Sequence, residues 1–417
     1  MLKRKLVCKM ILLLLLTGSL TGCWDREELE DRAYVIGLGI DPSKEKGKIK
    51  ITMLFANPEV GTMQGGGGSI EEPREIITFD ALDFVTAKGT ANAIISRDVS
   101  YDLLKVIVVS EEFAKDPRFI PTMFDARRDK EIRMDSYLAV SKEKAYKYFV
   151  KNKPKMETRP HKYFQFMINH GIENGMIPDS TLFRFFTTID RDADLFLAMY
   201  TSAERKKNAP ISGEDDFTAG ELNATGELDE TQFIGSAVFR NGKMVHTLTG
   251  LETRVVNILD DTTEIKDILT NLPDPFSNKL DELMAIRIIK RENNKIKMNP
   301  QASKLKIDIT VPLQFEVMTN PSMVNLAKSD KNQKILKEKI EKHIIETFER
   351  FLHKTQAELK GSPYPLSIHA RKDFTTMQEF DEFNWKKKYP DADISVNLDL
   401  RVIDYNAQNK KPTFMED

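Results

Sequence analysis

The chain has 417 residues, of which 41% are hydrophobic and 30% charged, and its formal net charge is −2. This composition is typical of a globular protein rather than a disordered one, and the length favours two or three domains of about 150 residues each. No long segment is dominated by Lys or Arg, which excludes an electrostatic case for binding nucleic acid.

Residues 1–22 have the order of a lipoprotein signal peptide: a basic start, an apolar block over 10–16, and small residues before Cys23. We expect cleavage before Cys23, which would carry a diacylglyceryl thioether and become the first residue of the mature chain. An uncleaved transmembrane anchor is the alternative, but it requires about 20 apolar residues and the run here is much shorter. In both cases the remaining chain lies outside the cytoplasmic membrane.

Removal of residues 1–22 takes away four basic residues and no acidic one, so the net charge of the mature chain is −6. Such a chain has little attraction for anionic lipid, and fatty acyl chains such as palmitate must supply the membrane affinity. The two cysteines are Cys8, lost with the signal peptide, and Cys23. The mature chain therefore has no thiol for a disulfide, a zinc site or nucleophilic catalysis.

The first part of the mature chain alternates strands and helices, which predicts a mixed sheet with flanking helices. The stretch 24–32 is helix-compatible, a four-glycine run over 65–68 suits a flexible hairpin tip, and Ser141 is the expected N-cap of the last helix. The expected strands are 33–42, 49–55, 106–109 and 134–140, and the expected helices are 79–95, 111–115, 119–129 and 141–150.

A segment rich in charged residues, Asn and Gly over 202–231 predicts a linker or long loop. The strand-like runs 233–239 and 243–248 flank Asn241-Gly242, a strong hairpin signal. A helix is expected over 251–259, followed by a break at 271–277, where two prolines occur.

The last third predicts a helix packed on a sheet. Residues 305–317 and 394–402 alternate apolar and polar side chains, as half-buried strands do, with Pro312 expected at an edge or a bulge. Between them, a helix is expected over 330–360 with Gly361 capping its end. Its predicted buried stripe is Leu336, Ile340, Ile344, Phe348, Phe351, Leu352 and Leu359.

These patterns predict an α+β protein with three mixed α/β domains, each a sheet covered by helices. The predicted division is 1–22 signal peptide, 23–202 N-terminal domain, 203–231 linker, 232–290 middle domain and 291–417 C-terminal domain.

Catalytic motifs are absent from the sequence. The six histidines show no metal-binding spacing, and there is no Gly-x-Ser-x-Gly elbow or dinucleotide fingerprint. The acidic pairs Glu27-Glu28 and Asp260-Asp261 are expected at the surface. The aromatic run 183–186 is expected in the core, with a partner-facing patch as the alternative. We therefore expect no metal, no cofactor beyond the diacylglycerol on Cys23, and a binding or assembly subunit rather than an enzyme.

The stretch Cys23-Trp24-Asp25-Arg26-Glu27-Glu28-Leu29, followed by Val35-Ile36-Gly37-Leu38-Gly39-Ile40-Asp41, resembles the opening of the Ger(x)C lipoproteins. These are the C subunits of nutrient germinant receptors in spore-forming bacteria. The resemblance continues through 95–98, 108–115 and 124–133, the hairpin at 235–245 and the C-terminal helix and strand.

The resemblance implies a non-enzymatic subunit of three α+β domains, lipid-anchored on the outer leaflet of the spore inner membrane and needed for receptor assembly and germination. Its implied partners are an embedded A subunit and a transporter-like B subunit. A substrate-binding lipoprotein of an importer is the alternative and predicts two similar lobes around a ligand cleft. A cell-wall hydrolase would need clustered carboxylates or a zinc site.

Two groups of residues are candidate sites. Trp24, Asp25 and Arg26, next to the lipid, are either a contact for the membrane or a partner, or a simple tether. A second group is expected to form buried ion pairs that fix the first domain, in preference to a partner surface: Arg97, Asp125, Arg128 and Arg133.

Overall fold

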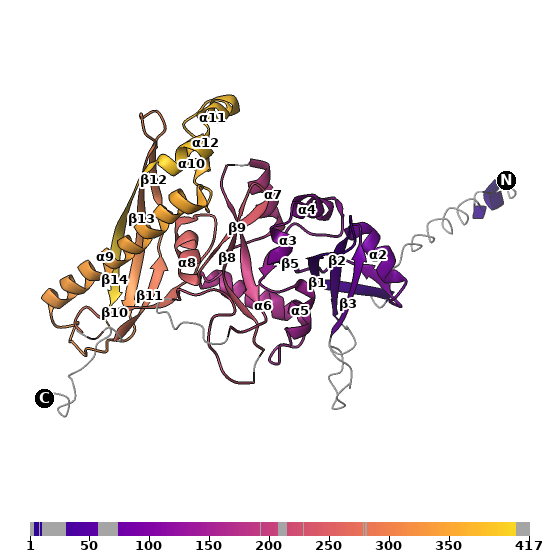
Figure 1. Ribbon diagram of the computed structural model, residues 1–417, viewed down its shortest axis with the longest axis horizontal. Coiled ribbons are helices and arrows are strands. Elements are labelled where there is room, and N and C mark those ends of the chain that lie inside the picture. Colours follow the sequence, from indigo (N-terminus) through magenta and orange to yellow (C-terminus); the bar gives the residue numbers. More distant parts are fainter. Residues whose placement is uncertain are drawn as a thin grey trace.

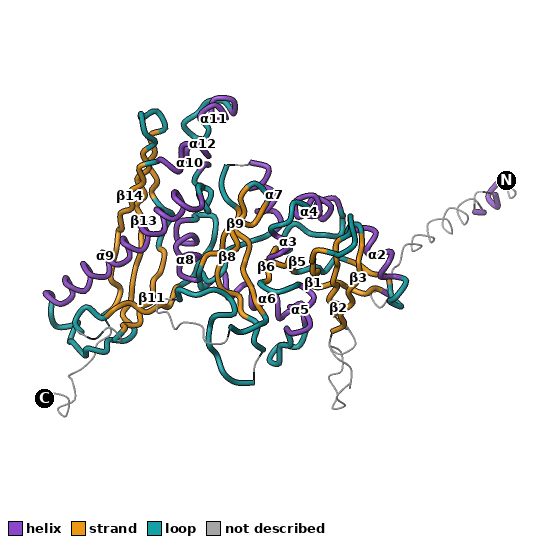
Figure 2. The backbone as a smooth tube through the Cα atoms, in the orientation of Figure 1, coloured by secondary structure: helices purple, strands orange, loops and turns teal. Residues whose placement is uncertain are grey.

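The structure, a computed structural model, describes residues 4–7, 9–10, 31–56, 74–191, 193–206, 215–227, 229–277, 279 and 282–405. Over these residues the chain forms two β-sheets, of nine and five strands, towards opposite ends of an elongated body (Figure 1). Both sheets carry helices, so the predicted α+β class is confirmed. Helices and strands alternate through the first sheet, whereas one long helix runs along the second (Figure 2).

The larger sheet is made of β1 (Arg32–Pro42), β2 (Ile49–Ala56), β3 (Arg74–Ala81), β4 (Asp98–Ser100), β5 (Val106–Ser110), β6 (Tyr137–Ser141), β7 (Phe196–Ser202), β8 (Gln232–Arg240) and β9 (Lys243–Leu248). Its order is β3-β2-β1-β5-β6-β7-β8-β9, and β4 pairs with the start of β1. Strands β1, β5, β6 and β7 run parallel. Antiparallel hairpins form both edges, including the predicted hairpin at Asn241-Gly242, where both residues have positive φ.

Helices cover both faces of this sheet, because its central strands are apolar on both sides. One face packs against α2 (Phe84–Asn92), α3 (Glu111–Ala114), α4 (Phe119–Arg128) and α7 (Leu182–Arg191). The other packs against α5 (Ala145–Lys151) and α6 (Pro160–Glu173).

The second sheet contains β10 (Ile268–Pro273), β11 (Leu283–Lys290), β12 (Lys295–Asn299), β13 (Lys306–Val317) and β14 (Asp393–Asp404). Strands β11 and β12 follow one another along one side of β13, and β14 runs parallel on its other side. Pro312 lies opposite the break between β11 and β12, where the Arg291 N–H donates to its carbonyl. Pro312 is therefore inside the sheet, not at an edge, at a place where the ladder is interrupted.

The long helix α9 (Asp330–Lys354) continues into a π-helical turn, Thr355–Leu359, and covers the apolar face of this sheet. All seven residues of its predicted stripe are buried. Three short helices follow before β14: α10 (Ser367–Arg371), α11 (Met377–Phe383) and α12 (Trp385–Lys388).

The predicted helix over 79–95 is wrong in its first part. Residues 74–81 form β3, which pairs with β2 along its whole length, and the helix begins only after Asp83, whose carboxylate accepts from the Thr86 N–H at 2.8 Å. Pairing with a distant strand outweighs the local helical pattern here.

Both predicted caps differ from the structure. Helix α5 begins four residues after Ser141, which ends β6. At the end of α9, Lys360 has the left-handed conformation (φ 51°) expected of Gly361. Gly361 instead permits a close approach, since a Cβ there would lie 2.9 Å from Leu195 Cγ.

The segment predicted as a middle domain, 232–290, has no sheet of its own in the described part of the chain. Strands β8 and β9 complete the first sheet, and β10 and β11 belong to the second. The expectation of three sheets was wrong because hairpins that read as local units pair with strands far away in sequence. The described parts of the predicted linker also pack on the body: the Gln232 side chain bonds Gly220 and Leu222, and Ala219 is buried.

Candidate functional site

The two sheets meet around α8 (Gly250–Leu259), which occupies the position of the predicted helix at 251–259. Eight of its ten residues are buried. One apolar cluster includes Leu197 and Val238 of the first sheet, Val255 of α8, and Ile307 and Phe315 of the second. The sheets therefore share a core and form one packed body rather than two lobes joined by a linker.

We call the region around α8, where the two sheets meet, the junction. On one side of it, side chains of α8 form hydrogen bonds with the first sheet and its loops. Thr253 bonds the Ser236 hydroxyl at 2.7 Å, and Arg254 donates to the Asn174 carbonyl at 3.2 Å while pairing with Asp215. Asn257 donates to the carbonyls of Gly175 and Ile177, both at 3.0 Å. Because Thr253, Arg254 and Asn257 are all buried, each side chain needs the hydrogen-bond partner it has.

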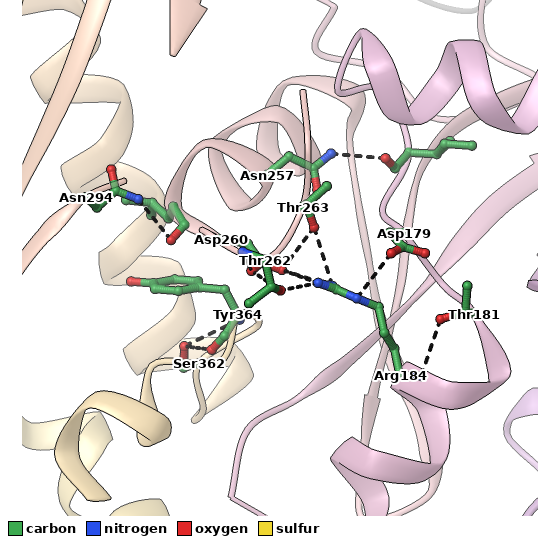
Figure 3. Close-up of polar contacts among 12 residues, drawn as sticks. Asp179, Thr181, Arg184, Asn257, Asp260, Thr262, Thr263, Asn294, Ser362 and Tyr364 are labelled. Atoms are coloured by element: carbon green, nitrogen blue, oxygen red, sulfur yellow. Dashed lines mark hydrogen bonds and ion pairs between the residues drawn. The ribbon is translucent and has the colours of Figure 1, made fainter. Parts of the chain in front are cut away.

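Asp260, directly after α8, binds Arg184 of α7 (Figure 3). The two guanidinium N–H groups of Arg184 lie 3.0 and 3.2 Å from one Asp260 oxygen, and Arg184 Nε lies 3.3 Å from Asp179. The hydroxyls of Thr262 and Thr263 also donate to Asp260. Burial raises the pKa of Asp179, while the nearby Arg184 charge opposes that shift.

Asp261 faces the other way, towards the second sheet. Its carboxylate accepts from Lys290 Nζ at 2.7 Å, and from the backbone and side-chain amides of Asn294 at 2.9 and 2.8 Å. The side chains of Lys290 and Asp261 are only 9% and 15% exposed. Asn294 also donates to the carbonyls of Ile258 and Leu259, which ties the turn between β11 and β12 to the end of α8.

A further contact joins the residues just before β7 of the first sheet to the segment after α9. The Leu195 N–H donates to the Ser362 carbonyl at 2.7 Å, and Asp194 accepts from the backbone and hydroxyl of Ser367. Burial raises the pKa of Asp194 to about 7. A cavity of about 440 Å³ lies beside these contacts, and its lining includes Asp179, Arg184, Arg191, Asp194, Asp260 and Tyr364.

This arrangement is suited to holding surfaces together. Arg184 and Asp260 bind each other, and Lys290 and Asp261 do the same, so these charges are committed to one another. Over the described residues no group of three or more His, Cys, Asp or Glu side chains is placed to hold a metal ion. What the junction supplies is a stiff polar connection between two sheets.

The prediction that Asp260 and Asp261 lie at the surface was wrong, since Asp260 is 5% exposed. The Asp260 carboxylate binds Arg184, on the side of the first sheet, and the Asp261 carboxylate binds Lys290 of the second sheet. A sequence signal was available: polar residues recur at 253, 254, 257 and 260, a spacing that places them on one face of a helix. What that face would bind could not be read from the sequence, because Arg184 and Lys290 lie 76 and 29 residues away.

The stretch Gly37-Leu38-Gly39-Ile40-Asp41 is the docking site of α5. A Cβ at Gly37 would lie 2.8 Å from the Phe149 ring, and one at Gly39 would lie 3.0 Å from Ala145, Phe149 and Thr52. The buried Asp41 carboxylate accepts from the N–H groups of Ala145 at 2.9 Å and Tyr146 at 3.1 Å. Asp41 is thus the cap of α5 that was expected from Ser141.

The predicted buried ion pairs lie at the surface. Arg128 and Asp125 are 3.8 Å apart with side chains 79% and 34% exposed, and Arg133 pairs with the exposed Asp135 at 2.6 Å. Arg97 is half-buried. The expectation of burial failed because the chain segments at the end of α4 face solvent on one side. Cys23, Trp24, Asp25 and Arg26 lie outside the described residues.

The aromatic run at 183–186 is divided between core and surface. Phe185 and Phe186 are buried and pack against each other edge-on, with Phe185 also against Phe119 and Phe196. Phe183 is 63% exposed and lines the cavity at the junction.

No helix in the described part of the chain is long and apolar enough to cross a bilayer. Residues 25–202 match the family model described as the spore germination protein N-terminal domain, and residues 234–406 match the one described as spore germination B3/GerAC-like, C-terminal.

Relatives with similar sequences come from Bacillus subtilis strain 168. The spore germination protein YfkR is 21% identical over 405 residues, which cover 94% of this chain and 95% of that one. Spore germination protein KC is 27% identical over 133 residues, 31% of this chain and 32% of the relative. A crystal structure of the GerBC protein aligns over 91% of this chain and 100% of its own, at 17% identity and a TM-score of 0.48.

Proposed function

The chain belongs to the GerAC-like family of spore germination proteins, and from this premise we propose that it is the non-catalytic C subunit of a nutrient germinant receptor. In this proposal Cys23 carries a diacylglyceryl group that anchors the chain to the outer leaflet of the spore inner membrane. Its partners are the A- and B-type membrane subunits, which it helps to assemble into a receptor that responds to nutrients.

The observation that supports this role best is the junction at Asp260 and Asp261. A subunit that acts by contact must hold its surfaces in fixed relative positions. Buried, hydrogen-bonded charge pairs on both sides of α8 provide such rigidity, since moving either sheet would leave a desolvated charge without a partner. The lipoprotein signal pattern before Cys23 supports the anchored location.

The importer alternative receives less support. It predicts two similar lobes, whereas the described residues form sheets of nine and five strands with different topologies and a shared core. A ligand of such a protein would need a cleft between the two lobes, and the cavity of about 440 Å³ beside Arg184 is the site at which to look for it.

A deletion strain tests the proposal. Spores lacking the gene should germinate more slowly with at least one nutrient, and the wild-type gene supplied in trans should restore the rate. Affinity-tagged protein from spore membranes should retain the A- and B-type subunits. Unchanged germination with every candidate nutrient, together with recovery of an importer permease and ATPase, would contradict the receptor proposal and favour the importer.

A further inference from the structure

Helix α2 presents an uncharged, partly apolar face to the outside of the molecule. Its inner face, Phe84, Ala87 and Ala91, is buried. On the outside, Leu82 is 64% exposed, Val85 55% and Ile94 64%. The other exposed residues between them, Thr86, Gly89, Thr90, Asn92 and Ala93, carry no charge.

The two charged residues of this stretch are turned away or engaged locally. Asp83 caps the helix by accepting from the Thr86 N–H. Lys88 reaches back to Glu131 at 2.7 Å and lies over the Tyr101 ring. Even the Thr90 hydroxyl donates to the Thr86 carbonyl at 3.2 Å, so it can leave water without losing its bond.

The α2 face lies at the same end of the body as Arg32, the first residue of β1. In the parallel pairing of β1 with β4, Arg32 lies opposite Asp98. The N–H of Val99 in β4 donates to the side chain of Asn92, the last residue of α2, at 2.9 Å. Only residues 24–31 separate Arg32 from Cys23, a reach of about 30 Å when fully extended. Helix α9 lies at the opposite end of the molecule (Figure 1).

We propose that the α2 face (Leu82, Val85, Gly89, Ala93 and Ile94) rests on the lipid surface and orients the body, with α2 towards the bilayer and α9 away from it. The inference rests on the acyl anchor at Cys23, because a short tether keeps this end of the body close to the lipid. An exposed apolar helix face next to an anchor buries itself in the headgroup boundary, typically to about 5–10 Å.

A lipid surface fits this face better than a protein partner does. The nine-residue helix offers two or three large apolar side chains and few hydrogen-bonding groups. A stable protein interface buries about 800 Å² per partner, with a polar rim and about ten hydrogen bonds. The face is too small and too poor in donors and acceptors for that, whereas lipid contact needs only apolar side chains.

Site-specific fluorescence tests the contact in the acylated, full-length mature protein. Once Cys23 is acylated the mature chain has no free thiol, so Val85→Cys introduces a single labelling site. Matched controls are Phe166→Cys, an apolar position on α6 that is 46% exposed, and Glu338→Cys on α9, 64% exposed. Each variant, labelled with a polarity-sensitive dye, is reconstituted into phosphatidylcholine vesicles with and without lipids carrying a quencher near the headgroup.

The proposal expects lipid quenchers to reduce the fluorescence of the label at position 85, because it lies at the depth of the headgroups, and to leave both controls unchanged. If the protein floats with the vesicles but Val85 behaves like Phe166, the anchor stands and the α2 contact is wrong. If Val85 becomes shielded only when another membrane protein is present, a protein covers the face and the lipid contact is also wrong. If the protein does not float with vesicles at all, the anchor itself fails and the contact fails with it.

Discussion

Asp260 and Asp261 are neighbours in the chain, yet their carboxylates bind opposite sides of the molecule. Asp260 lies 3.0 Å from Arg184 of α7, and Asp261 lies 2.7 Å from Lys290 at the end of β11. This divergence places one charge pair on each side of α8 and joins the two sheets across a shared core. Separating either sheet from α8 would therefore leave a buried carboxylate without its cationic partner.

Replacing Arg184 should destabilise the protein strongly. Arg184→Met leaves the buried Asp260 carboxylate without its cationic partner, and removing one member of such a pair costs about 3 kcal/mol. Urea unfolding of the mature chain measures the loss. Arg133→Met removes an exposed pair of the same type and should leave the unfolding midpoint unchanged. Equal midpoints for the two variants would show that the Arg184 pair contributes nothing to stability.

The pair on the other side of α8 is testable by a double-mutant cycle. Asp261→Ala and Lys290→Met should each destabilise the fold, because each leaves a buried charge unpaired. The double variant should lose less than the sum of the two, with a coupling of about 1–3 kcal/mol. Strict additivity of the two unfolding free energies would mean that Lys290 and Asp261 do not interact.

Replacing Gly37 or Gly89 with Ala should change the stability of the protein in opposite directions. Gly37→Ala places a Cβ 2.8 Å from the Phe149 ring, so α5 must move away from the sheet, at a cost of about 1–3 kcal/mol. Gly89→Ala, in the middle of α2 with nothing within 4 Å of its Cβ, should stabilise by about 0.5–1 kcal/mol. Thermal unfolding of the two variants decides the matter, and a stabilising Gly37→Ala would rule out the close packing described for β1.

Regular patterns made much of the fold predictable. The alternation over 305–317, the stripe of α9 and the turn at Asn241-Gly242 depend on neighbouring residues, and the structure confirms them. In contrast, β3 depends on pairing with β2, and the two edge hairpins that divide 232–290 between the sheets depend on partners elsewhere.

The junction shows why the site was harder to predict than the fold. A carboxylate followed by another carboxylate is common on protein surfaces, and the cationic partner of the buried Asp260 is the distant Arg184. Likewise, Asp41 lies near the end of the predicted strand over 33–42, while its carboxylate caps a helix that begins 104 residues later. The spacing of such polar side chains can be read from a sequence, but their distant partners cannot.

Asp194 should make the stability of the protein depend on pH. Burial raises its pKa from 3.8 to about 7, so between these values the folded chain holds a proton that the unfolded chain has released. The contribution of Asp194 to the free energy of unfolding of the wild type therefore falls as the pH rises towards 7. Asp194→Asn removes this titration, so its stability relative to the wild type should increase between pH 4 and pH 7 and level off above. Urea midpoints that run parallel for both proteins across this range would contradict the shift.

The anchored location, the receptor proposal and the α2 contact all depend on the chemical state of Cys23. Mass spectrometry of the N-terminal peptide, from protein purified from spore membranes, measures that state directly. The account predicts a chain that begins at Cys23 and carries a diacylglyceryl group. A chain with an unmodified Cys23, or one that still begins upstream of it, would contradict the account.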